Sequence, residues 1–114
     1  MAQNYLKQIQ KEFSHIKKHE EDDLEWWNEG LDLIEQGKLA EAEKKFKMLI
    51  VSQPQHSDGF EGLAKVYTKM NRIEEARYFI DLAVERAKRS VQSGDTDSEI
   101  LEIMLEQKKA IEKL

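Results

Sequence analysis

The sequence predicts an all-α protein made of stacked helical hairpins, and three observations lead to this fold class. The chain matches itself at an offset of 34 residues, which is typical of architectures whose short units bury their apolar faces on one another. Apolar residues recur at spacings of three and four, and Gly or Asn separates the periodic stretches. The matched pairs are Trp26–Phe60, Gly30–Ala64, Leu33–Tyr67, Gly37–Asn71, Leu39–Ile73, Glu41–Glu75, Ala42–Ala76, Phe46–Ile80 and Leu49–Ala83.

The first predicted element is a helix over residues 3–19. Its apolar side chains recur every three or four residues, so they form one stripe on an otherwise charged helix. Because such a stripe has to be buried, we expect residues 1–22 to pack on the stack as a half-repeat before the first full repeat. The stripe consists of Tyr5, Leu6, Ile9, Phe13 and Ile16.

Two helical hairpins follow, over residues 23–56 and 57–90. Gly37 and Asn71 lie between the periodic stretches, and these residue types let a helix end in the left-handed conformation. Pro54 cannot continue a helix, so it ends the first repeat. Small residues at equivalent positions allow the two antiparallel helices of each hairpin to approach closely. These residues are Gly30, Ala42, Ala64 and Ala76.

The last predicted element is a capping helix within residues 91–114. It is preceded by Thr96, Asp97, Ser98 and Glu99, a combination that is typical of a helix start. We expect one side of this helix to seal the open end of the stack, which solenoids need for solubility. That side carries Ile100, Ile103, Met104, Ile111 and Leu114. With the four helices of the hairpins, the prediction is about six helices in a single domain over residues 1–114.

The composition fits one small soluble domain. The chain has 114 residues, of which 39% are hydrophobic and 36% charged, enough for one continuous core. The longest apolar run, residues 48–51, is far shorter than a membrane span, and the N-terminus is too polar for a secretory signal. We therefore expect a cytoplasmic protein with no membrane partner. The absence of cysteine excludes a disulfide framework, a thiol nucleophile and a thiolate metal site.

The spacing of the repeat residues resembles that of the tetratricopeptide repeat family. The first copy has Trp26, Gly30, Leu33, Ala42, Phe46 and Pro54 at the family's positions, and the second has Phe60, Leu63, Ala64, Tyr67, Ala76 and Ile80. Glu29 and Lys88 stand where the family has Leu and Pro. The resemblance covers residues 23–90. It implies a right-handed superhelix of antiparallel hairpins whose concave groove binds peptides or other proteins.

A candidate groove surface lies on the first helix of the first repeat. Trp27, Leu31 and Ile34 are spaced four and three apart and form a second apolar stripe beside the core-facing one. The resemblance implies that this stripe lines the groove and continues in the second repeat through Asp58, Glu61, Lys65, Thr68 and Lys69. We expect partner-binding through the apolar stripe, while Lys65 and Lys69 attract acidic side chains. The alternative is that the N-terminal helix covers the stripe. Trp27 and Leu31 replace the Lys and Asn with which some family members grip a C-terminal carboxylate, so that mode of binding is not expected.

The sequence predicts no metal site and no catalytic site. His15 and His19 share a helix face, but no third ligand is placed near them and lysines flank them. The stretch with Asp95, Asp97 and Glu99 lacks the Gly and the terminal Glu of a calcium loop. The sequence contains no nucleophile elbow and no phosphate-binding glycine loop. We therefore predict no enzyme activity, no catalytic residue, no metal and no cofactor.

The expected partner is a protein or peptide. A net charge of −5 disfavours nucleic acid, and acidic neighbours within a helical turn make the basic cluster a solvated helix face. That cluster consists of Lys44, Lys45 and Lys47. The predicted function is a non-catalytic interaction adaptor or scaffold that is a monomer or weak homo-oligomer. The alternative is a structural, self-assembling protein whose terminal helices mediate oligomerisation.

Overall fold

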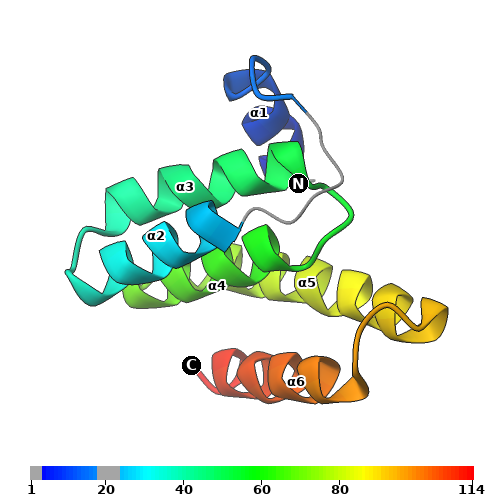
Figure 1. The fold of residues 1–114 in the computed structure, drawn as a ribbon. Helices are drawn as coiled ribbons and strands as arrows, with labels where there is room; N and C mark the ends of the chain where they lie inside the picture. Colours follow the sequence, from blue (N-terminus) through cyan, green and yellow to red (C-terminus); the bar gives the residue numbers. More distant parts are fainter. Residues whose placement is uncertain (1–3, 18–23) are drawn as a thin grey trace.

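A computed structural model describes residues 4–17 and 24–114, and these residues form six helices (Figure 1). The helices are α1 Tyr5–Glu12, α2 Leu24–Glu35, α3 Leu39–Ser52, α4 Asp58–Lys69, α5 Ile73–Ser93 and α6 Ser98–Glu112. The described part of the chain contains no strand, so the all-α prediction is confirmed. Each helix from α2 onward packs against the next one, and α2 also contacts α4.

Equivalent helices of the two repeats begin at residues separated by the repeat length of the sequence. α2 and α4 begin at Leu24 and Asp58, and they end at Glu35 and Lys69. Both pairs of bounds are 34 residues apart, so the two helices have the same length and the same phase in the repeat. α3 and α5 also begin 34 residues apart, although α5 is longer, with 21 residues against 14. The repeated residues therefore form equivalent local structures.

The turns after α2 and α4 are equivalent as well. Gly37 has φ 78° and Asn71 has φ 62°, the left-handed conformation predicted for both residues. The residue after each turn donates its backbone N–H to the carbonyl five residues back, over 2.8 Å in both cases: Lys38 to Leu33, and Arg72 to Tyr67. Each turn thus satisfies a carbonyl at a helix end and reverses the chain within three residues.

The centre of the core is the ring of Phe46, which is fully buried on α3. A Cβ atom at Gly30 of α2 would lie 2.6 Å from Phe46 Cε1, and one at Gly62 of α4 would lie 2.5 Å from Phe46 Cγ. The ring is therefore held between two helix backbones that approach it only because both positions lack a side chain. This contact places α3 between α2 and α4.

A buried arginine ties the second pair of helices to the first. Arg86 of α5 is 8% exposed, its Nε donates to the carbonyl of Pro54 over 2.7 Å, and its guanidinium lies 4.0 Å from the ring centre of Phe60. The hydrogen bond and the aromatic ring compensate for the removal of the cation from water. The loop that follows α3 is thereby fixed on α5.

The N-terminal helix is shorter than predicted. α1 ends at Glu12, and Phe13 leaves the helix with φ −112° and ψ 34°. Ile9 and Phe13 are both buried. The helix predicted over residues 3–19 is therefore wrong at its C-terminal end, since the chain turns where Phe13 enters the core and burial outweighs a further turn of helix. Residues 18–23 lie outside the described part of the chain.

The C-terminal helix begins as predicted but buries fewer apolar side chains. Asp97 precedes α6 in an extended conformation, as an N-cap residue does. Of the five apolar side chains predicted to face the stack, Met104 and Ile111 are buried, whereas Ile100, Ile103 and Leu114 are exposed. The prediction is wrong for these three, because α6 has apolar residues on two faces and the stack covers only one of them.

Candidate functional site

The predicted apolar stripe lies on α2 at the edge of the core. Trp27, Leu31 and Ile34 are partly buried and pack against the buried cluster. The rings of Trp27 and Phe46 meet edge to face, with their centres 5.6 Å apart and their planes at 62°. Trp27 therefore both contacts the core and contributes to the surface of α2.

The described part of the N-terminal segment packs on other helices. α1 contacts α3, and the ring of Tyr5 lies 5.1 Å from that of Tyr78 and 6.0 Å from that of Phe79, both on α5. Figure 1 shows α1 across the end of α3, away from α6. The alternative in which the N-terminal helix covers the stripe of α2 is thus not supported by these contacts. Residues 1–3 and 18–23 of the same segment lie outside the described residues.

The predicted basic residues of the groove lie on α4, which contacts α2. Lys65 is partly buried, and its Nζ lies 3.9 Å from Glu61 Oε2, whereas Lys69 is exposed. Glu61 also accepts a hydrogen bond from Gln107 Nε2 over 2.8 Å, so α6 is attached to α4 at this residue. Glu61 compensates part of the charge of Lys65. Lys69 is therefore the more available cation of the two for an acidic partner.

A cavity that the sequence did not predict lies between α1, α2 and α3. It is open and has a volume of about 1040 Å³. Its apolar side chains are few and its rim is charged, with acidic and basic groups close together. The side chains that α2 contributes to it lie on a different face from Trp27, Leu31 and Ile34. The lining residues are Glu12, Phe13, His15, Glu29, Asp32, Leu33, Gln36, Ala40, Glu41, Glu43, Lys44, Lys45, Lys47 and Met48.

The basic cluster of α3 lies along this cavity, and two of its three lysines form ion pairs. Lys45 Nζ lies 2.8 Å from Glu29 Oε2 of α2, and Lys47 Nζ lies 3.4 Å from Glu43 Oε2 one turn earlier. These partners agree with the prediction of a solvated helix face. The pairs neutralise much of the charge that a phosphate backbone would require.

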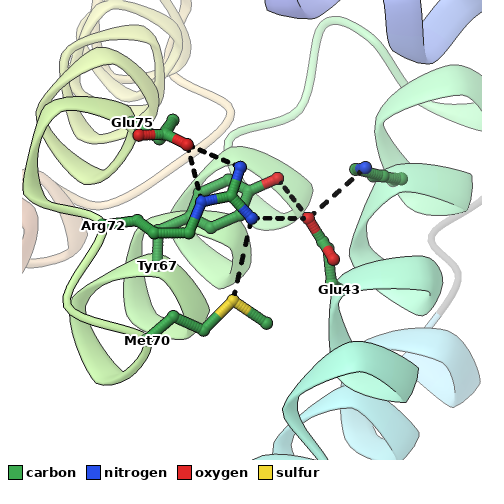
Figure 2. Close-up of polar contacts among 6 residues, drawn as sticks. Glu43, Tyr67, Met70, Arg72 and Glu75 are labelled. Atoms are coloured by element: carbon green, nitrogen blue, oxygen red, sulfur yellow. Dashed lines mark hydrogen bonds and ion pairs between the residues drawn. The ribbon is translucent and has the colours of Figure 1, made fainter.

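A polar network joins α3, α4 and α5 (Figure 2). Tyr67 Oη donates to Glu43 Oε2 over 2.6 Å, and the guanidinium of Arg72 lies 4.5 Å from the centre of the Tyr67 ring. Arg72 Nε donates to Glu75 Oε2 over 2.6 Å, and its Nη1 lies 3.7 Å from Glu43 Oε2. All four charged or polar groups therefore have partners within the network.

The network keeps the Tyr67 hydroxyl protonated. Burial of the ring, followed by the hydrogen bond to Glu43, raises the pKa of Tyr67 far above its ordinary value of 10.0. A phenol of this kind acts as a hydrogen-bond donor at neutral pH and not as a nucleophile. The network therefore serves to hold the second repeat against the first.

Two features of the site were missed by the sequence analysis. The pairing of Glu43 with Tyr67 spans 24 positions, and nothing in the repeat pattern indicates it. The role of Gly62 had a signal, because a glycine inside a helix costs about 1 kcal/mol relative to alanine and usually marks a close approach. Two glycines in the 12 residues of α4 are such a signal.

Within residues 4–17 and 24–114, no group of three or more His, Cys, Asp or Glu side chains is arranged to hold a metal ion. No helix in this part of the chain is long and apolar enough to cross a membrane. Comparisons of the chain with protein-family models, with curated proteins and with solved structures find no match in any of the three.

Proposed function

We propose that the protein is a non-catalytic interaction adaptor that binds a peptide or protein segment on the surface shared by α2 and α4. In this proposal the helix pairs form a right-handed stack similar to that of the tetratricopeptide repeat family, with α2 and α4 on its concave side. The 34-residue offset between α2 and α4, and the matching turns at Gly37 and Asn71, support the stack.

The observation that carries the proposal is the partly exposed apolar stripe of α2. Trp27, Leu31 and Ile34 remain accessible in part, although the described N-terminal helix packs on α3 and α5. A tryptophan flanked by aliphatic side chains is the kind of anchor that dominates binding energies in protein interfaces. An apolar segment of a partner would complete the burial of these side chains.

The basic residues of α4 give the surface a preference for acidic partners. Lys69 is exposed and Lys65 is partly so. Charges at an exposed rim mainly change the association rate and its salt dependence, because solvent screens their attraction. We therefore expect Lys65→Ala and Lys69→Ala to slow association, with less effect on dissociation.

The contact between Trp27 and Phe46 decides which variant tests the proposal. Trp27→Ala would remove an aromatic neighbour of the core ring as well as a binding anchor, so a loss of binding would have two explanations. Leu31→Lys changes the stripe without removing the contact between Trp27 and Phe46. Because Leu31 also packs against the core, the thermal melt of this variant is compared with that of the parent. Leu105→Lys is the matched control, because Leu105 is exposed and belongs to α6, which lies on the far side of the molecule from α2 (Figure 1).

The experiment is a selection of peptides from a random display library against the full chain, followed by titration of a selected peptide. Mapping of its amide chemical-shift changes is expected to place it on α2 and α4. Leu31→Lys should weaken its affinity about tenfold or more, the effect of losing roughly 1.4 kcal/mol. The control Leu105→Lys should bind as the parent does. Shift changes confined to the cavity between α1, α2 and α3, or full affinity in Leu31→Lys, would contradict the proposed surface. Failure to select any saturable peptide would contradict the adaptor function itself.

A further inference from the structure

One flank of α6, beside its buried face, carries an exposed apolar stripe. Ile100 is 41% exposed, Ile103 is 49% exposed and Leu114 is 64% exposed. With Ala110 they are spaced three, seven and four residues apart on one side of α6 and the two residues that follow it, a spacing typical of a helix that pairs with another helix. This stripe is separate from the buried face of Met104 and Ile111, so α6 has a second face to cover.

The orientation of α6 is set by polar contacts on both sides of its buried face. Gln107 Nε2 donates to Glu61 of α4 over 2.8 Å, and Lys108 Nζ lies 3.1 Å from Asp81 Oδ1 of α5. Figure 1 shows α6 along one edge of the molecule, on the opposite side of the stack from α1. These contacts hold α6 in an orientation that leaves the apolar stripe on its flank exposed.

The charges of α6 are divided between its two halves. Its first half carries Glu99 and Glu102 and no basic residue, whereas its second half, with Lys113, carries three lysines and two glutamates. Along one edge of the stripe the order is Glu99, Glu106 and Lys113, each seven residues from the next. Two copies of α6 laid antiparallel would bring Glu99 of one copy towards Lys113 of the other. In a parallel pair the two copies of this edge would lie on opposite sides of the seam, so Glu99 of one copy and Lys113 of the other would not meet.

We propose that the protein forms a twofold-symmetric homodimer through antiparallel pairing of α6 along the stripe of Ile100, Ile103 and Leu114. A self-complementary surface of this kind closes on itself and does not propagate into a filament. The seam is one helix of 15 residues, so the dimer is weak, with a dissociation constant on the order of micromolar or above. The seam includes none of Trp27, Leu31 and Ile34, so each copy in the dimer keeps the apolar stripe of α2 proposed to bind a partner.

Sedimentation equilibrium of the full chain over a wide range of concentration tests the dimer. The mass is expected to rise from 13.4 kDa towards twice that value as the concentration increases. Ile103→Lys should keep the chain monomeric at every concentration, whereas Leu105→Lys, on another face of α6 with similar exposure, should dimerise as the parent does. Circular dichroism melts check that both variants remain folded. A parent that stays monomeric at millimolar concentration overturns the proposal, as does a dimer that survives Ile103→Lys.

Charge exchange tests the antiparallel direction. Glu99→Lys alone and Lys113→Glu alone should each weaken the dimer several-fold, and both changes in one chain should restore it. Glu106 lies midway between these residues, so its two copies meet near the symmetry axis, and Glu106→Gln should strengthen the dimer. A double exchange that weakens the dimer further would exclude this arrangement. A dimer abolished by Leu31→Lys and not by Ile103→Lys would assign self-association to the α2–α4 surface, and the proposal would be wrong.

Discussion

Gly62→Ala is expected to destabilise the protein even though alanine is the better helix former. A Cβ at this position would lie 2.5 Å from Phe46 Cγ and closer still to two other ring atoms, whereas carbon atoms prefer about 3.5–4.0 Å. The ring would have to move by about 1 Å or more. It cannot move towards α2, because the backbone at Gly30 approaches it from the other side and Phe46 is fully buried.

The magnitude is a balance of two effects. Replacing a glycine by alanine inside a helix gains about 1 kcal/mol. Forcing an additional methyl group into a close-packed core costs about 1–3 kcal/mol. Because the ring of Phe46 is confined on two sides, we expect the upper end of that cost, and hence a net loss of about 2 kcal/mol. For a domain of this size the loss corresponds to a decrease in Tm of roughly 8 °C.

The assay is a double-mutant cycle with Phe46→Leu, measured by urea unfolding. Phe46→Leu alone should cost more than the roughly 1 kcal/mol of a single methyl deletion and less than the about 3–5 kcal/mol of Phe→Ala. The smaller side chain makes room for the new methyl group, so the double variant should be less destabilised than the sum of the two single variants. Gly37→Ala is the control, because its cost of about 1–2 kcal/mol comes from the positive φ alone and should add to that of Phe46→Leu. Additive free energies in the Gly62 cycle, or a stabilised Gly62→Ala, would refute the proposed confinement of the ring.

Three further predictions follow from the same packing. Ala76→Leu should lower the free energy of unfolding by about 1–3 kcal/mol in thermal melts, because Ala76 is fully buried. Lys45→Ala, in a partly exposed ion pair, should cost at most about 1 kcal/mol, and an Ala76→Leu variant as stable as the parent would show that the helix contact is assigned wrongly. The folded-state pKa of Tyr67 is raised, so the contribution of Tyr67 to stability is complete below the ordinary tyrosine pKa of 10.0 and is lost as the pH rises above it. The free energy of unfolding, measured between pH 9 and 12, should therefore fall more steeply in the parent than in Tyr67→Phe. Equal slopes would be inconsistent with a buried, hydrogen-bonded phenol. Deletion of residues 96–114 should cause aggregation, measured by light scattering, because the apolar surface of α5 that α6 covers becomes exposed. A truncated chain that stays monomeric and unfolds cooperatively would show that α6 is dispensable for folding and solubility.

The part of the fold that could be predicted is the part specified by residues close in sequence. The turns after α2 and α4 depend on the left-handed conformation of Gly37 and Asn71, which these residue types adopt at low cost. The buried positions of Ala42, Phe46 and Ala76 follow from the repeat, because a side chain in phase with its copies faces the same neighbour. The positions of Trp27, Leu31, Ile34, Lys65 and Lys69 on α2 and α4 also follow from this phase, whereas the groove and its binding role stay a prediction.

The parts that could not be predicted depend on contacts between distant residues. α1 ends at Glu12 because burial of the Phe13 side chain is more favourable than a further turn of helix, although the helical spacing of apolar residues continues in the sequence. The network of Glu43, Tyr67 and Arg72 joins three helices and has no counterpart at the repeat spacing. Periodicity describes which residues share a helix face, but it does not state which neighbour covers that face.

The sequence by itself determined the helical class, the 34-residue repeat, the two left-handed turns and the small residues at the helix contacts. These depend on backbone sterics and on the 3.6-residue period, which act locally. The tertiary structure decided that Phe46 is held between Gly30 and Gly62, that α1 packs on α3 and α5, and that α6 turns Met104 inward and Ile103 outward. The reason is physical: an apolar face gains free energy from any neighbour that removes it from water, so only the packing of the whole chain selects which neighbour does so.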